Sequence, residues 1–247
     1  QSRKVYLAVY AAERTGNPHA FDHGTRDGHL LEQIIEKDLE LRNRKVELSE
    51  AFPAYKRQKS YLLAGLLIDD VSNYALLSGV HAVKKDGVYH RGMEGFCAEQ
   101  NMVQVPLAVL SEWERMECDH NEIWIVENPS IFARLCGEHP CMCMNGQPRL
   151  AGLLVLDLLA EAGTVIHYAG DLDPEGLLIA QKLSQYYKGA FYYWHMTEED
   201  YHMCRSEEAL SERRIGMLQK ITDPQLLPVA RAIAEYGMAG YQEKIDY

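Results

Sequence analysis

The stretch TVIHYAGDLDPEG (residues 164–176) decides the fold of the second half of this chain. It opens with a short apolar run rich in β-branched and aromatic residues, which predicts a strand over 164–170. Asp171 and Asp173 follow in an acidic turn, and Asp173 before Pro174 is a good helix N-cap. The stretch therefore predicts a strand, an acidic loop and a helix in direct succession.

The same alternation of strand and helix extends from about residue 121 onward. Short apolar runs predict strands, and longer apolar segments with helical spacing predict helices between them. The predicted strands are EIWIV (122–126), CMCMN (141–145), TVIHYAG (164–170) and AFYYWHM (190–196). The predicted helices are 129–136, 148–162 and 174–187, and 197–247 reads as further helices that pack on the sheet. This alternation is typical of an α/β protein with a parallel sheet.

The first part of the chain has a different pattern, with mostly helical spacing of its apolar residues. β-type residues at 74–83 lead to a turn at 85–87 and predict a hairpin that ends near Tyr89. The predicted helices are 5–12, 26–43, 61–68 and 106–116. We therefore predict two parts: a mainly helical, α+β region over 1–118, and an α/β domain with C-terminal helices over 119–247.

The composition is that of an ordinary globular protein: 47% of the 247 residues are apolar and 25% are charged. No apolar run approaches the ~20 residues that a membrane span requires, and no signal peptide is visible, so we expect a cytoplasmic protein without membrane contact. Because the chain begins with Gln1 instead of Met, we expect it to be a fragment of a longer protein, and the family resemblance described below implies that it is the C-terminal part. The net charge of −11 argues against a protein that coats DNA by itself.

Acidic side chains follow two of the predicted strands at the point where each strand ends. Glu127 follows the first strand, and Asp171, Asp173 and Glu175 follow the third. In open α/β sheets, functional groups lie beyond the carboxyl ends of the strands, so these carboxylates are expected to gather at one edge. Clustered carboxylates repel one another, and a bound divalent ion relieves that repulsion. Oxygen-only ligands favour Mg²⁺ or Mn²⁺ over zinc.

The two acidic motifs together resemble the toprim domain, which is shared by topoisomerases, bacterial primases and several nucleases. VENPS contains the first acid of the toprim pattern, Glu127, and DLDPEG contains its Asp-x-Asp pair, Asp171 and Asp173. By this resemblance these three acids are catalytic and bind the metal, and Glu175, which matches an optional further acid, is a secondary or outer-shell metal ligand. The alternative interpretation makes the same acids helix caps and turn residues.

A longer likeness runs from about residue 10 to residue 190. TGNPHAFDHGTRDGHLL, LLIDDVSNYALL, VENPSIF, NGQPRLAGLLVLDLL and HYAGDLDPEGLLIAQKL resemble a bacterial family that includes the JetD-like subunits of Wadjet plasmid-defence systems. Those subunits resemble the A subunit of topoisomerase VI, which has toprim late in its chain and a winged helix before it. The resemblance implies a toprim-type parallel sheet flanked by helices, preceded by a region that contains a winged helix. It also implies DNA as the substrate, an SMC-type ATPase complex as a partner, and a homodimer.

The chemistry implied by this resemblance is metal-assisted cleavage of phosphodiesters. Gly146 and Gln147 follow the second predicted strand, so they are expected at the same edge as the acids, in contact with phosphate or a metal-bound water. A plain turn is the alternative for Gln147. Water is the favoured nucleophile, because the Wadjet resemblance implies a nuclease. A topoisomerase VI-like protein uses a tyrosine, and the upstream candidates, each of which also reads as a packing residue, are Tyr55, Tyr61, Tyr74 and Tyr89.

Three functions follow as hypotheses. The favoured one is a Mg²⁺- or Mn²⁺-dependent DNA endonuclease subunit of an anti-plasmid defence complex. The others are a topoisomerase VI A-like DNA transesterase and a non-catalytic toprim scaffold that binds a partner. Two further features stay open: Arg213 and Arg214 read as a solvated helix face in preference to a DNA contact, and no role is assigned to the segment 241–243.

Overall fold

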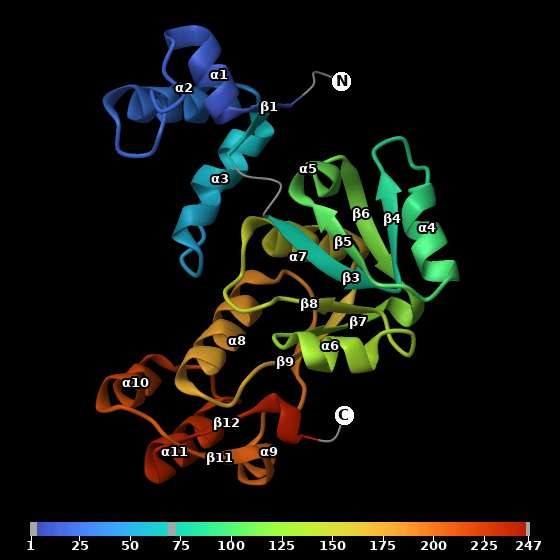
Figure 1. Ribbon diagram of the computed structural model, residues 1–247, viewed down its shortest axis with the longest axis vertical. Coiled ribbons are helices and arrows are strands. Elements are labelled where there is room, and N and C mark those ends of the chain that lie inside the picture. Colours follow the sequence, from blue (N-terminus) through green and yellow to red (C-terminus); the bar gives the residue numbers. More distant parts are fainter. Residues whose placement is uncertain (1–3, 69–72, 246–247) are drawn as a thin grey trace.

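The computed structural model describes residues 4–68 and 73–245, so residues 69–72 of the stretch LLIDDVSNYALL lie outside the described part. Figure 1 shows three tiers along the longest axis. Helices of the N-terminal part lie at one end, a β-sheet with its helices lies in the middle, and the C-terminal segment lies at the other end. None of the helices within 4–68 and 73–245 is long and apolar enough to cross a lipid bilayer.

The middle tier is built on a six-stranded sheet with the order β10-β9-β7-β8-β3-β5. Neighbouring strands among β10, β9, β7 and β8 are parallel. In chain order, β7 to β10 occupy Glu122–Val126, Cys141–Cys143, Val165–Ala169 and Phe191–Tyr193. The predicted α/β fold and its four strands are thus confirmed. Helices or loops cover both faces of much of this sheet, which explains why its strands appear as nearly continuous apolar runs.

Two antiparallel strands extend the parallel part of the sheet. β3 (Tyr74–Ser78) pairs with β8, and β5 (Val103–Pro106) pairs with β3. The sheet is therefore mixed, where the sequence predicted only parallel strands. It also contains strands from both sides of residue 118, since β3 and β5 precede that residue and β7 to β10 follow it.

Helices cover the parallel strands on both faces. α7 (Leu150–Ala162) and α8 (Pro174–Tyr186) share one buried cluster with Ile123 and Ile125. α6 (Pro129–Leu135) packs against Val126, whose side chain points to the opposite face because successive residues of a strand alternate. The three helices predicted after the first three parallel strands are confirmed, each within two residues of its predicted bounds.

The N-terminal tier consists of α1 (Leu7–Thr15), α2 (Arg26–Leu41) and α3 (Pro53–Leu63). The predicted helices at 5–12 and 26–43 correspond to α1 and α2. The helix predicted at 61–68 is wrong in its bounds. α3 begins at Pro53 and ends before Gly65, whose φ of 86° is left-handed and stops a helix. β2 (Leu66–Leu67) follows and pairs in parallel with β1 (Val5–Tyr6).

A small antiparallel sheet is formed by two strands that alternate along the chain with β3 and β5 of the central sheet. It pairs β4 (Val80–Lys84) with β6 (Trp113–Cys118), and α4 (Arg91–Ala98) lies beside β4. The predicted turn at 85–87 exists, with Gly87 at a φ of 77°. It closes a single bridge from Val83 to Tyr89, because β4 takes β6 as its partner. β3 and β4 belong to different sheets, so the predicted single strand over 74–83 is two strands.

The helix predicted at 106–116 is wrong. α5 covers only Leu107–Leu110, and the chain then forms β6. Trp113 and Met116, at 3% and 0% exposure, are buried from a strand that pairs with β4 along its length. Long-range pairing therefore overrides the helical spacing of the local apolar residues. A 3₁₀ turn at Asp119–Asn121 connects β6 to β7.

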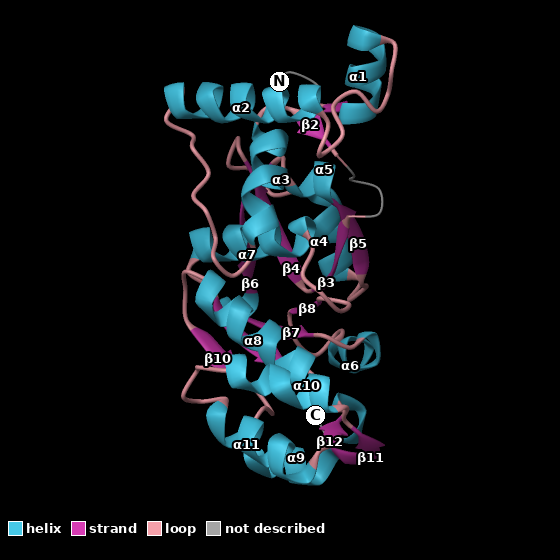
Figure 2. Cartoon of the chain, turned by 90° about the vertical axis from the view of Figure 1, so that its left-hand side faces the viewer, coloured by secondary structure: helices cyan, strands magenta, loops and turns pink. Residues whose placement is uncertain are grey.

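The C-terminal tier contains the helices predicted after residue 197 and a two-stranded sheet that was not predicted. The helices are α9 (Glu198–Cys204), α10 (Glu212–Met217) and α11 (Leu227–Tyr236), with 3₁₀ turns at Leu218–Lys220 and Gln242–Lys244. β11 (Arg205–Ala209) and β12 (Met238–Gly240) pair in antiparallel fashion. Figure 2 shows α10 beside α8, which places the C-terminal tier next to the loop that precedes α8.

A partly buried carboxylate joins the N-terminal tier to the central one. Asp157 of α7 accepts hydrogen bonds from the hydroxyls of Tyr55 and Tyr186, the latter at 2.7 Å, and Lys59 Nζ lies 2.5 Å from the same group. We expect Asp157→Ala to lower the free energy of unfolding by about 2 kcal/mol, because two phenolic donors lose their acceptor. Urea unfolding measures this change. Glu161→Ala, on an exposed position of the same helix, is the control, and equal losses for both variants would contradict the prediction.

Candidate metal site at the carboxyl edge of the sheet

Adjacent parallel strands bring the first two predicted acids together. β7 and β9 are neighbours with Val126 opposite Ala169. Glu127 directly follows β7, and its backbone N–H donates to the carbonyl of Ala169 at 3.2 Å. Asp171 comes two residues after the end of β9. The expectation that these acids lie at the carboxyl edge of the sheet is therefore met by the register of two strands.

Glu127 has a carboxylate oxygen that is buried without a partner. Within the described residues, Oε2 of Glu127 makes no hydrogen bond. Gly170 leaves room for it, since a Cβ on Gly170 would lie 3.1 Å from this oxygen. Burial, and then the nearby charges of Asp171 and Asp173, raise the pKa of Glu127 to about 7. A buried polar atom without a partner is costly, so this oxygen marks a place where a cation or a proton stabilises the site.

Asp171 is tied to the C-terminal segment. Its Oδ1 accepts a hydrogen bond from the backbone N–H of Gln242 at 3.1 Å. The adjacent Leu172 exchanges two backbone hydrogen bonds with Gly240, of 3.0 and 2.9 Å. Burial raises the pKa of Asp171 to about 6, although the bond from Gln242 acts in the opposite direction. The acidic loop is thus held between β9 and β12.

Asp173 begins α8 and also forms an ion pair. Its Oδ1 accepts from the backbone N–H of Gly176 at 2.7 Å, which is the N-cap that the sequence predicted. Its Oδ2 lies 2.6 Å from Nη2 of Arg214. The helix-cap interpretation of Asp173 is confirmed, and the same residue also lies in the acidic cluster. Burial is the main cause that raises its pKa.

Glu175 lies in the first turn of α8 and binds Arg214 through two nitrogens. Nε of Arg214 is 2.9 Å and Nη2 is 2.8 Å from Oε2 of Glu175. From the sequence, Arg213 and Arg214 were both predicted to lie on a solvated helix face. Arg213 is exposed, but Arg214 reaches the acids from α10. No local pattern distinguishes the two arginines, so only the packing of α10 beside α8 identifies the second as part of the site.

Two tyrosines near the acids were also missed. The hydroxyl of Tyr168 is buried, makes no hydrogen bond to any described residue, and lies 3.1 Å from the Cβ position of Gly170, as Oε2 of Glu127 does. Tyr241 donates its hydroxyl to Glu208, and this bond is the main cause that raises its pKa to about 12. Together with Gln242, it gives the segment 241–243 a place at the site. The alternation of side chains along a strand could have predicted that Tyr168 faces inward, but it could not have predicted which groups surround its hydroxyl.

The predicted substrate residues lie on the loop after β8. Gly146 has a φ of 88°, and Gln147 is exposed. Because β8 is parallel to β7 and adjacent to it, this loop leaves the sheet at the same edge as Glu127. Among the described residues, the side-chain hydrogen bonds of Asp171, Asp173 and Glu175 go to Gln242, Gly176 and Arg214 and not to Gly146 or Gln147. The structure thus brings the acids together and leaves Gly146 and Gln147 as an exposed turn at their edge.

The four tyrosines proposed as nucleophiles have other environments. Tyr55 and Tyr61 are buried in α3, and Tyr55 donates to Asp157. The hydroxyl of Tyr89 donates to Glu117 at 2.6 Å. Tyr74 begins β3, at the end of that strand where it pairs with β5. None of these contacts involves the acidic cluster.

The carboxylates of Glu127, Asp171 and Asp173 fit a hard divalent ion, although Asp171 and Asp173 already accept hydrogen bonds from other groups. Carboxylate oxygens are what Mg²⁺ and Mn²⁺ prefer, and Glu127 offers one that is buried without a partner. In residues 4–68 and 73–245, no group of three or more Asp, Glu, His or Cys side chains is already arranged around one point. Arg214 contacts both Asp173 and Glu175 in the place of such a group.

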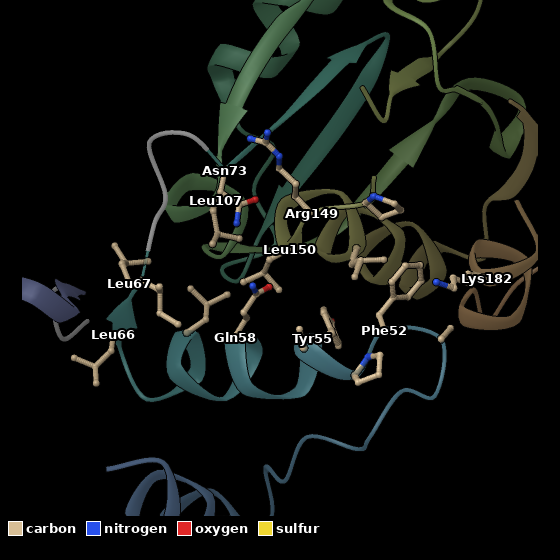
Figure 3. A pocket seen from close by; sticks show the side chains of 17 residues that line it. Phe52, Tyr55, Gln58, Leu66, Leu67, Asn73, Leu107, Arg149, Leu150 and Lys182 are labelled. Carbon is tan, nitrogen blue, oxygen red and sulfur yellow. The ribbon is translucent and has the colours of Figure 1, made fainter. Parts of the chain in front are cut away.

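A pocket elsewhere in the molecule does not include the acids. Figure 3 shows this pocket, of about 580 Å³, between α3 and α7, with Phe52, Gln58 and Leu150 among its lining residues. Glu127, Asp171 and Asp173 lie outside its lining. The acids therefore belong to a different part of the molecule from this pocket.

This protein is therefore an α/β protein with acidic residues at the carboxyl edge of its parallel strands. The chain belongs to the family described as "Protein of unknown function C-terminus (DUF2399)", which matches residues 103–246. A second family, described as "Protein of unknown function N-terminus (DUF3323)", matches residues 1–82. No curated protein matches the chain.

Proposed function

We propose that this protein is a Mg²⁺- or Mn²⁺-dependent DNA endonuclease, acting as the toprim subunit of a bacterial anti-plasmid defence complex of the JetD-like kind. The observation that carries this proposal is the buried oxygen of Glu127 without a partner, beside Asp171 at the carboxyl edge of β7 and β9. Burial raises the pKa of both carboxylates, so a divalent ion bound between Glu127 and Asp171 would stabilise their charged forms. The sequence likeness to toprim nucleases supports the same assignment.

In this function Glu127 and Asp171 hold the ion, with Asp173 as the third ligand. When bound, the ion neutralises charge on a phosphodiester and on its leaving oxygen. Asp173 also fixes the start of α8 through its bond to Gly176, which keeps the acidic loop in one conformation. Water is the proposed nucleophile, since the four upstream tyrosines make their contacts elsewhere.

The charge of the chain bears on its partners. A net charge of −11 repels DNA, so a phosphate approaches the acidic edge only when cations occupy it or when a partner supplies positive charge. This supports action within a complex, and we propose an SMC-type ATPase complex and a second copy of this chain as partners. Gly146 and Gln147, on the exposed turn at the same edge, are the proposed contacts to the DNA backbone.

One observation favours a second candidate, the non-catalytic scaffold. Arg214 and the backbone of Gln242 already bind three of the four acids, so the cluster has internal partners without any metal. In this alternative, the carboxylates hold the C-terminal tier against the sheet and take up no divalent ion.

Metal binding by Asp171→Asn separates the two candidates. We expect this variant to bind Mn²⁺ roughly 100-fold more weakly than the wild type in calorimetry, because it removes one anionic ligand. It should also lose Mn²⁺-dependent nicking of plasmid DNA. Asp119→Asn, on an exposed aspartate at the opposite end of β7, is the matched control and should bind like the wild type.

The outcomes are distinct. If the wild type binds no Mn²⁺, or if Asp171→Asn binds it equally well, the nuclease proposal fails and the scaffold is favoured. A covalent link between protein and DNA after cleavage would replace water with a tyrosine nucleophile and support the topoisomerase VI-like alternative.

A further inference from the structure

Arg214 is the cation that the structure places in the acidic site. It extends from α10, a short helix that packs beside α8, and its side chain is 27% exposed. Nη2 bridges Oδ2 of Asp173, at 2.6 Å, and Oε2 of Glu175, at 2.8 Å. Nη1 lies 3.8 Å from Glu208, so three carboxylates surround one guanidinium.

These contacts use the oxygens that a divalent ion requires. Oδ1 of Asp173 accepts from the N–H of Gly176, and Oδ2 accepts from Arg214. An ion held jointly by Glu127, Asp171 and Asp173 would therefore share the Asp173 carboxylate with the positive charge of the guanidinium. Two cations on one half-buried carboxylate repel each other strongly, because water screens them little there. Metal and Arg214 are thus expected to exclude one another at Asp173.

We propose that Arg214 is an internal counter-ion that competes with the divalent cation for Asp173, so that loading of the metal releases the guanidinium from this residue. This inference rests on the proposed metal site at Glu127 and Asp171. It also accounts for the lack of a ready-made group of three ligands in the described part of the chain.

Glu175 gives the released guanidinium a second anchor. Its carboxylate contacts both Nε and Nη2 of Arg214, so the side chain stays at the site when Asp173 turns to the metal. The N–H of Nη2 that faced Asp173 is then free to donate to a phosphate oxygen, for which the planar guanidinium is well suited. Glu175 is accordingly assigned as a positioning residue for Arg214 and not as a metal ligand.

The test is the affinity for Mn²⁺, measured by calorimetry and by the loss of the free-ion signal in electron paramagnetic resonance. We expect Arg214→Gln to bind Mn²⁺ about 10-fold more tightly than the wild type, because the competing cation is gone. Arg213→Gln removes the same charge from the exposed neighbouring position and serves as the matched control. Its affinity should equal that of the wild type.

Equal or weaker Mn²⁺ binding by Arg214→Gln, relative to Arg213→Gln, would overturn the proposal. A second measurement uses the wild type and does not depend on whether the variant folds: the Nη2–H resonances of Arg214, which contact Asp173, should shift on titration with Mg²⁺, and resonances that stay unchanged at saturating Mg²⁺ contradict displacement. Glu127→Gln separates a failure of the proposed metal site from a failure of the proposed role of Arg214. If Glu127→Gln binds Mn²⁺ like the wild type, the metal site itself is wrong; if it does not bind, only the role of Arg214 is in question.

Discussion

Gly176→Ala is expected to destabilise the acidic loop more than any other single methyl addition near the site. A Cβ on Gly176 would lie 2.2 Å from the backbone carbonyl oxygen of Asp171, and backbone atoms cannot move aside as a flexible side chain can. The N–H of Gly176 also bonds to Asp173, so a shift of the residue breaks the N-cap of α8. We expect a loss of about 3 kcal/mol in the free energy of unfolding, measured by urea denaturation.

The same substitution should abolish Mn²⁺ binding, because displacement of the Asp171 backbone separates its side chain from Glu127. Gly95→Ala is the control. Gly95 lies inside α4, and a Cβ there would meet open space, so alanine should stabilise this helix by roughly 0.5 to 1 kcal/mol. A Gly176→Ala protein that is as stable as the wild type and binds Mn²⁺ equally well would show that the loop adapts freely.

The metal-free protein should lose stability as the pH rises from about 5 to 8. In the folded state the pKa of Glu127 is raised to about 7 from an ordinary value of 4.5, mainly by burial. Between these two pH values the folded chain binds more protons than the unfolded chain, so the free energy of unfolding decreases with increasing pH. The expected loss from Glu127 is roughly 2 to 3 kcal/mol, reached near pH 8. Asp171, with a pKa raised to about 6, adds to it in the same direction.

Urea unfolding of the wild type and of Glu127→Gln across this pH range tests the prediction. The amide cannot ionise, so the stability of the variant should fall much less, and the variant should be the more stable protein at pH 8. Saturating Mg²⁺ should remove the loss in the wild type, because a ligand that binds only the folded state stabilises it. Parallel pH profiles for the two proteins would refute the assignment of the raised pKa to Glu127.

The C-terminal tier contacts the acidic site on which the predictions for Gly176 and Glu127 both depend. Gln242 and Gly240 hold the acidic loop from one side, and Arg214 holds its carboxylates from the other. If the proposed displacement of Arg214 occurs, the metal content of the site is coupled to the position of α10. A partner that binds the C-terminal tier would then alter metal affinity without touching the metal.

The sequence by itself determined the parallel core and the location of its acids. The runs 122–126 and 164–170 are apolar, short and followed by acids, and both became strands at the predicted positions, β7 and β9. Strand formation there depends on local composition, and the edge at which Glu127 and Asp171 emerge follows from the direction of a parallel sheet. The N-cap at Asp173 is equally local, because its partner is three residues away.

Only the tertiary structure decided which groups surround those acids. Arg214 lies 41 positions after Asp173, and Gln242 lies 71 positions after Asp171, so no periodicity connects them. The same reason explains the error at 106–116, where pairing of β6 with β4 overrode a helical pattern. Contacts between distant segments depend on how whole elements pack. Local sequence therefore specified the strands and the acids, and packing specified which cation and which backbone donor reach them.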